Sequence, residues 1–151
     1  MSFLERKEDE RVRIFVAGTF DIIHVGHIRF LYAAKRLAKN SELIVVVARD
    51  KTVERLKGRK PVFNELERLE IVNALKPVDK AVLGYESENI FEILKEIRPD
   101  IVVLGYDQRV SEKELICWAQ MNGLSFRVLR LPKFDASISS SSEARRRIMR
   151  K

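Results

Sequence analysis

The chain has 151 residues, of which 46% are hydrophobic and 34% charged, and its net charge is +7. A single domain of this length buries roughly 70% of the surface that its unfolded chain exposes. The one cysteine excludes a disulfide framework within the chain and a zinc site built from cysteines. No apolar run approaches the ~20 residues that span a bilayer, and the N-terminus is charged where a signal peptide is apolar. We therefore expect a cytoplasmic protein, without a membrane partner, that binds anions.

After a charged arm (residues 1–11), apolar runs alternate with segments of helical period. The predicted strands are residues 12–17, 43–48, 80–83, 101–104 and 125–131. The predicted helices are residues 28–38, a short segment within 51–60, 64–75, 87–97, 111–121 and a basic segment within 139–151. Nearly continuous apolar strands are typical of a parallel sheet that is covered on both faces. The alternation predicts a single α/β domain (residues 1–151) with a Rossmann-like, doubly wound, parallel five-stranded sheet.

Polar residues at the starts of several segments predict where helices begin. Asn64, with Glu67 three residues later, is a variant of the capping box. Ser87 is the predicted N-cap of the helix that Pro99 stops, and Ser140 or Ser141 caps the last helix.

Both histidines of the chain lie in the loop after the first predicted strand, Gly18-Thr19-Phe20-Asp21-Ile22-Ile23-His24-Val25-Gly26-His27. In an open α/β sheet, ligands bind beyond the carboxyl ends of the strands, where a helix N-terminus presents free N–H groups to a phosphate. Gly18 and Gly26 allow tight turns and a close approach of the backbone to a ligand. Imidazoles at i and i+3 can point to one side and donate hydrogen bonds to oxygens that gain charge in a transition state. Two structural histidines that cap a turn, or a zinc pair, are the alternatives.

This loop resembles the GxFDxxHxGH signature of the nucleotidyltransferase superfamily that also carries the HIGH motif of class I aminoacyl-tRNA synthetases. The Phe-Asp pair without a following proline is similar to the cytidylyltransferase-like branch. The resemblance implies that His24 and His27 are catalytic. It also implies a set of nucleotide-binding residues in this loop: Gly18, Thr19, Phe20, Asp21, His24, Val25, Gly26 and His27.

The stretch Ile138-Ser139-Ser140-Ser141 is similar to the second signature of the superfamily, ISTT or ISSS. The resemblance implies that Ser139, Ser140 and Ser141 hold the β- and γ-phosphates with hydroxyls and amides at a helix N-terminus. Helix capping alone would also explain these serines.

The segment Leu104-Gly105-Tyr106-Asp107-Gln108 indicates one group within the superfamily. It is similar to the archaeal FAD synthase group, which transfers AMP from ATP to FMN, and it implies that Asp107 lies near the ribose or base. Phe134 stands where cytidylyltransferases carry an arginine. An aromatic ring there can stack on a purine, although it could also be a buried anchor of its loop.

Basic residues supply the remaining candidates. Lys60, with Arg59, lies in the segment where the family has catalytic lysines, and Arg68 matches a family arginine on the following helix. Lys76 stands where another family arginine is usual. Taken singly, a residue of this kind is more often a solvated surface cation than a ligand.

The implied reaction is in-line attack by the FMN phosphate on the α-phosphorus of ATP, with release of pyrophosphate. No general base is needed, because a phosphate monoester is largely ionised at neutral pH. We expect Mg²⁺ or another divalent cation with ATP, mostly water-ligated and held at most indirectly by Asp21. No protein-bound metal and no tightly bound organic cofactor are expected.

Other substrates and other functions stay open. The chain could be a glycerol-3-phosphate cytidylyltransferase that uses CTP, or an adenylyltransferase for another phosphorylated cofactor precursor. A non-enzymatic nucleotide- or RNA-binding domain would use the basic tail (residues 145–151), although no nucleic acid is expected. A homodimer through the apolar helix face near Trp118 is an analogy with the family.

Overall fold

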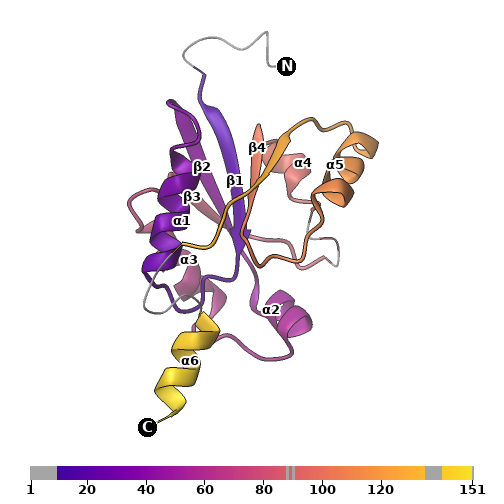
Figure 1. Cartoon of the computed structure of the whole chain (residues 1–151). Coiled ribbons are helices and arrows are strands. Elements are labelled where there is room, and N and C mark those ends of the chain that lie inside the picture. The colour runs from indigo at the N-terminus through magenta and orange to yellow at the C-terminus, as the bar shows by residue number, and fades with distance from the viewer. Residues whose placement is uncertain (1–9, 88, 90, 135–140, 151) are drawn as a thin grey trace.

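Five parallel strands form one sheet in the computed structural model, which describes residues 10–87, 89, 91–134 and 141–150 (Figure 1). The strand order is β3-β2-β1-β4-β5. The strands are β1 (Val12–Gly18), β2 (Ser41–Val47), β3 (Lys80–Leu83), β4 (Ile101–Leu104) and β5 (Arg127–Arg130). This order is that of a doubly wound sheet, so the predicted Rossmann-like fold class is confirmed.

Helices cover both faces of the sheet (Figure 1). The first core cluster lies under α1 (Val25–Lys35) and α3 (Glu65–Asn73), and the second lies under α4 (Leu94–Ile97) and α5 (Glu112–Met121). Ile14 of β1 faces the first cluster and its neighbour Phe15 faces the second. Because alternate residues of one strand face two covered sides, the strand is apolar at nearly every position.

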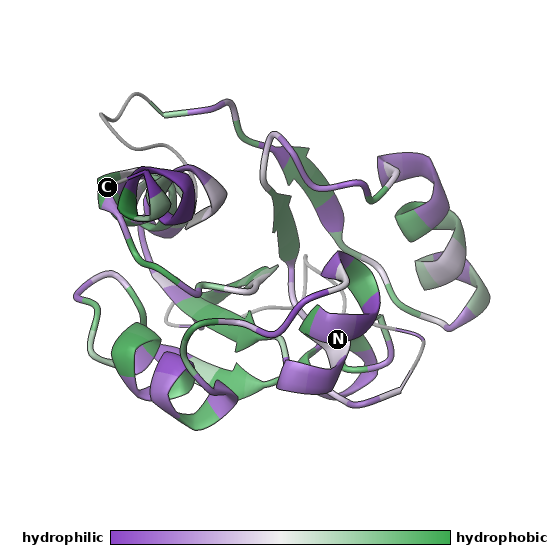
Figure 2. Ribbon diagram, turned by 90° about the horizontal axis from the view of Figure 1, so that it is seen from below, coloured by the Kyte–Doolittle hydropathy of each residue, from purple (hydrophilic) through white to green (hydrophobic). Residues whose placement is uncertain are grey.

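The sheet opens at its carboxyl edge between β1 and β4. The pairing of β1 with β2 continues to Gly18, whereas that of β1 with β4 ends at Val16 and Val103. The chain leaves these two strands in opposite directions, which creates the crevice where such sheets bind ligands. Two further helices, α2 (Asp50–Lys57) and α6 (Ser141–Met149), lie at this edge (Figure 1). Viewed from this side, the strands are the hydrophobic layer and α6 is mixed (Figure 2).

Most boundaries lie within a few residues of their prediction, and two helix starts differ most. The first helix starts at Val25 rather than at residue 28, because His24 is its N-cap. The helix predicted from Ser87 is wrong in its N-terminal half, since α4 begins only at Leu94. The Ser87 hydroxyl donates to the carbonyl of Asn89, and the Asn89 side chain accepts from the N–H of Phe91. These local side-chain bonds replace the helical ladder.

The cap at Asn64 is confirmed, since its side chain accepts the N–H of Glu67. Trp118, the proposed dimer contact, is half-buried and packs on Phe91 within the chain, so the dimer stays a prediction. No helix in the described ranges is long and apolar enough to cross a membrane.

Candidate active site

The two histidines cap the start of α1, because the ring of each accepts a backbone N–H there. The Nδ1 atom of His24 accepts the N–H of Gly26 at 3.1 Å, and the Nδ1 atom of His27 accepts the N–H of His24 at 3.1 Å. Their ring centroids are 3.9 Å apart. Because both Nδ1 atoms are acceptors, the proton of each neutral imidazole is on Nε2.

The surroundings keep these imidazoles neutral. Burial, together with the electrostatic effects of His24 and Lys57, lowers the pKa of His27 to about 4. Burial also lowers the pKa of His24, and the carboxylate of Glu143 partly opposes that shift. The Nε2 atom of His24 is buried without a hydrogen-bond partner among the described residues. An N–H donor held in this way is suited to an incoming oxygen ligand.

Gly18 has a role that the sequence interpretation did not foresee. A Cβ atom at this position would lie 2.8 Å from the ring of Phe20. Phe20 itself has φ of 52°, and its buried ring lies beside His27, with the centroids 5.6 Å apart. The glycine therefore gives the aromatic ring the space that positions the histidine loop.

Asp21 is buried and joins three segments. Its carboxylate accepts the N–H groups of Val62 at 2.8 Å and Phe63 at 2.9 Å, and it forms an ion pair with Arg145 of α6. All of these partners hold the loop in place. Asp21 therefore orients the loop, and its bonded carboxylate has little capacity left to hold a metal.

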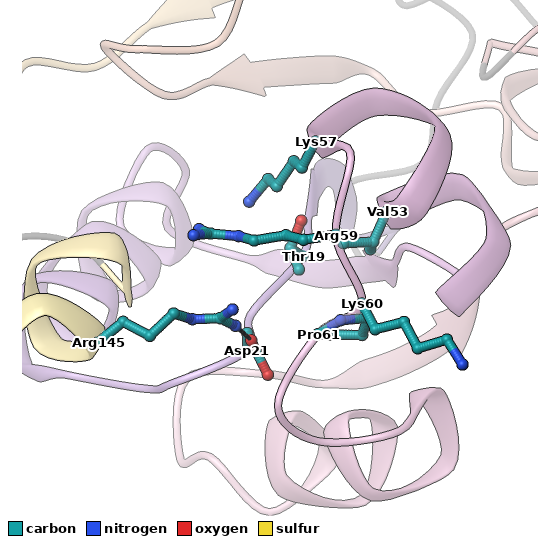
Figure 3. A pocket seen from close by; sticks show the side chains of 8 residues that line it. All are labelled: Thr19, Asp21, Val53, Lys57, Arg59, Lys60, Pro61 and Arg145. Atoms are coloured by element: carbon teal, nitrogen blue, oxygen red, sulfur yellow. Dashed lines mark hydrogen bonds and ion pairs between the residues drawn. The ribbon is translucent and has the colours of Figure 1, made fainter. Parts of the chain in front are cut away.

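Three cations from two distant parts of the chain converge beside Asp21 (Figure 3). Lys57 ends α2 and Arg59 follows it, and the side chains of both point toward Arg145 of α6. Arg59 also donates to the hydroxyl of Ser142 at 3.0 Å. A small pocket lies among them, lined by Thr19, Asp21, Val53, Lys57, Arg59, Lys60, Pro61 and Arg145. This concentration of positive charge favours a polyphosphate.

Lys57 lies among charges of both signs. Burial lowers its pKa and Arg59 lowers it further, while Asp21 and Asp107 act in the opposite direction. An anion bound here would relieve that repulsion.

The side chain of Lys60 points away from the three converging cations (Figure 3). Lys60 also borders a neighbouring hollow that contains Asp50, Glu54 and Glu67. Its catalytic role stays a prediction.

Arg68 is not exposed to the crevice, as a residue that contacts the substrate would be. Its side chain is fully buried, and its guanidinium donates to the carbonyls of Phe63, Thr19 and Ala48 at 2.7–2.9 Å. It also pairs with Asp50 at 2.7 Å. The predicted catalytic role is therefore corrected, because no surface of Arg68 is open to a ligand. Arg68 fixes the ends of β1 and β2 relative to α2 and α3.

The other predicted nucleotide-binding residues are placed in part. Asp107 is exposed after β4, at the same edge as the histidine loop, and it acts electrostatically on Lys57. Val25 is the first residue of α1, and Phe134 is half-exposed after β5. Ser139 and Ser140 lie outside the described residues, and Ser141 begins α6.

Sequence reasoning missed Lys57 and Arg145 as site residues. Lys57 looked like an ordinary cation at a helix end, and Arg145 is one of three consecutive arginines. Only the packing of α6 on the histidine loop distinguishes Arg145 from Arg146 and Arg147. The sequence offered one indication of their role. Lys57 lies close to Arg59 and Lys60, and Arg145 lies shortly after the serines of the second signature.

The comparisons with known proteins agree with this geometry. A family model described as cytidylyltransferase-like matches residues 15–147, which include the histidine loop, the converging cations and most of α6. The chain belongs to the cytidylyltransferase-like family. The resemblance drawn from the GxFDxxHxGH loop is thereby confirmed.

Several curated relatives within reach of this family are FAD synthases. An FAD synthase of Thermoplasma acidophilum is 45% identical over 138 residues, which are 91% of this chain and 94% of the relative. An FAD synthase of Korarchaeum cryptofilum is 51% identical over 130 residues, which are 85% of this chain and 87% of the relative. Among solved structures, a Thermoplasma volcanium protein described as a lipopolysaccharide core biosynthesis protein is similar, with a TM-score of 0.78 and 41% identity. The match covers 83% of this chain and all of that one.

Proposed function

We propose that the protein is an FAD synthase, which transfers AMP from ATP to FMN and releases pyrophosphate. The observation that carries the proposal is the pair of neutral imidazoles at the opening of the sheet, each with its proton on Nε2, beside Lys57, Arg59 and Arg145. The chain is 42–51% identical to several archaeal FAD synthases. That kinship favours ATP and FMN as the substrates.

In this proposal the chain acts by positioning and charge stabilisation. The phosphate of FMN is itself the nucleophile, so the site needs no side chain that removes a proton. His24 and His27 donate their Nε2–H groups to the α-phosphate and to the oxygen that bridges to the leaving pyrophosphate. These donors are in place before ATP binds, because the α1 cap holds them.

The basic residues bind the remaining phosphates in the same proposal. Lys57, Arg59 and Arg145 hold the pyrophosphate end, and Ser139, Ser140 and Ser141 contribute hydroxyls and amides there. Asp107 and Phe134 contact the ribose and the base. The adenine preference rests on Phe134, whose ring replaces the arginine of the cytidylyltransferases.

The described residues build no site for a divalent cation. No group of three histidine, cysteine or acidic side chains that could hold a metal occurs in the described part of the chain. Asp21 is already bonded to two N–H groups and Arg145. Mg²⁺ is therefore proposed only as an ion bound by ATP oxygens and water.

The test is a substrate panel on the full chain. ATP or CTP is combined with FMN or glycerol 3-phosphate in the presence of Mg²⁺, and pyrophosphate release and the products are measured. We expect pyrophosphate and FAD from ATP with FMN only. Turnover of CTP with glycerol 3-phosphate, without FAD formation, would overturn the proposal in favour of a cytidylyltransferase. Nucleotide binding without pyrophosphate release in any combination would favour a non-enzymatic role.

A further inference from the structure

Gln108 bridges β1 and β4 where their backbones separate. Its amide oxygen accepts the N–H of Gly105 at 2.7 Å, and its amide nitrogen donates to the carbonyl of Ala17 at 2.9 Å. The last paired residues of these strands, Val16 and Val103, lie just before this point. The glutamine amide therefore takes the place of the next rung of the ladder and holds the strands one amide width apart. Its orientation is fixed, because one partner can only donate and the other can only accept.

Arg130 secures the outer side of the same loop. Its guanidinium donates to the carbonyls of Gly105 at 2.7 Å, Gln108 at 2.9 Å and Val110 at 2.6 Å, and it pairs with Glu112. The loop after β4 is thus held by side chains on both sides, although it has no regular secondary structure.

This loop faces the histidine loop across the opening of the sheet. Ala17, one partner of Gln108, directly precedes Gly18, and Asp107 directly precedes Gln108. Gln108 is turned to the strands, while Asp107 is exposed and acts electrostatically on Lys57. A change in the bridge would therefore move Asp107 and the β1 end relative to each other.

Other side chains cannot make this bridge. Glutamate lacks the donor for Ala17, asparagine is one methylene shorter, and an apolar residue would leave the N–H of Gly105 and the carbonyl of Ala17 without partners. Two part-buried backbone groups left without partners would destabilise this edge of the sheet, so the chain favours the amide at this position.

We propose that Gln108 is a positioning residue that sets the width of the nucleotide crevice, with Arg130 locking the loop that it holds. The inference rests on the proposed function, since it assigns the crevice to ATP. The bridge lies between β1 and β4, at the crevice assigned here to ATP, so we expect its effect on nucleotide binding.

The test measures binding of a non-hydrolysable ATP analogue with Mg²⁺, and of FMN, by calorimetry on the full chain. Gln108→Ala and Gln108→Glu are compared with the wild type and with Gln120→Ala, a control at the other glutamine of the chain, which is exposed on α5. We expect both Gln108 variants to bind the ATP analogue ~10-fold or more weakly, with FMN affinity and KM for FMN within ~2-fold. The control should match the wild type.

A double-mutant cycle keeps the inference testable if Gln108→Ala folds poorly. Arg130→Gln, alone and with Gln108→Glu, should weaken ATP binding less than additively, since both residues hold one loop. ATP affinity that is unchanged in the Gln108 variants, or ATP and FMN affinities that fall by equal factors, would overturn the inference.

The proposed function is judged separately by FAD formation in the wild type. If the wild type binds ATP but makes no FAD, the proposed function is overturned. The role of Gln108 is then still decided by the ATP affinities of its variants.

Discussion

At the N-terminus of α1, His24 and His27, the donors proposed for catalysis, are also the capping groups. Each Nδ1 atom accepts a backbone N–H, which leaves each Nε2–H for the ligand. Protonation at Nδ1 would break the cap, so the structure ties the shape of the loop to the neutral form of both rings. This explains why both histidines of the chain lie three residues apart in a single turn.

Replacing His27 by asparagine separates capping from donation. The asparagine oxygen can accept the N–H of His24 in place of Nδ1, but it offers no donor at the position of Nε2. We expect His27→Asn to lose ~100-fold or more in kcat, the usual scale for a transition-state donor, with its melting temperature little changed. Steady-state kinetics and thermal unfolding measure the two effects. Turnover near that of the wild type would exclude a catalytic role for His27.

The free energy of unfolding should decrease as the pH falls from 6.5 to about 4, because His27 is still neutral in the folded chain over this range. The pKa of His27 is about 4 in the folded chain against 6.5 in the unfolded chain, so the unfolded chain takes up the proton first as pH falls. The contribution is full above pH 6.5 and decreases toward pH 4. Urea unfolding of the wild type and of His27→Asn between about pH 7.5 and about pH 4.5 tests this. The wild type should lose more stability than the variant, and equal losses would contradict the assignment.

At the scale of elements, two buried charges hold the carboxyl edge together. Arg68 joins the ends of β1 and β2 to α2, and Asp21 joins the histidine loop to α6 and to the segment before α3. The loops of the candidate site have little regular structure of their own, so these side chains carry their alignment.

Arg68→Met should destabilise the whole edge. It removes four hydrogen bonds and leaves several carbonyls and Asp50 without their partner, for which we expect a loss of about 3 kcal/mol in the free energy of unfolding. Denaturant unfolding measures it, with Arg127→Met, at an exposed position of β5, as the matched control. A variant as stable as the control would show that the buried contacts contribute nothing.

Gly18→Ala should disturb the histidine loop through Phe20. The added Cβ would lie 2.8 Å from that ring, and relief of such overpacking typically costs about 1–3 kcal/mol. Gly105→Ala serves as the stability control, since a Cβ there has only ordinary contacts at 3.6 Å or more. Thermal unfolding should show the larger loss for Gly18→Ala, and adding Phe20→Leu should recover part of it. Equal losses in the two glycine variants would argue against the steric account.

The sequence was informative where a local pattern determines the structure. The apolar runs predicted the strands, and the GxFDxxHxGH loop predicted the position of the site. Ser87 misled because its side chain forms a local turn with Asn89 that competes with the helix. Arg68 misled for a different reason, since a family match does not reveal whether a side chain is buried. Lys57 and Arg145 depend on how α2 and α6 pack, which no local pattern records.

At the scale of the whole molecule, part of the net charge of +7 has a specific location. Lys57 and Arg59 come from the middle of the chain and Arg145 from its last helix, and they meet at the opening of the sheet (Figure 3). Arg145 is thereby engaged with Asp21, so the basic C-terminal segment is partly committed to the site. A second phosphorylated substrate and a pyrophosphate product suit such a concentration of cations.

The most direct test of AMP transfer follows the phosphorus atoms of ATP. The full chain is incubated with FMN, Mg²⁺ and ATP labelled either at the α- or at the γ-phosphate, and the products are separated by chromatography. The account predicts that the α-label appears in FAD, in equal amount to the FMN consumed, and that the γ-label appears in pyrophosphate. Transfer of the γ-label to the flavin would contradict it. So would an experiment in which FMN is not consumed and the α-label stays in free nucleotides.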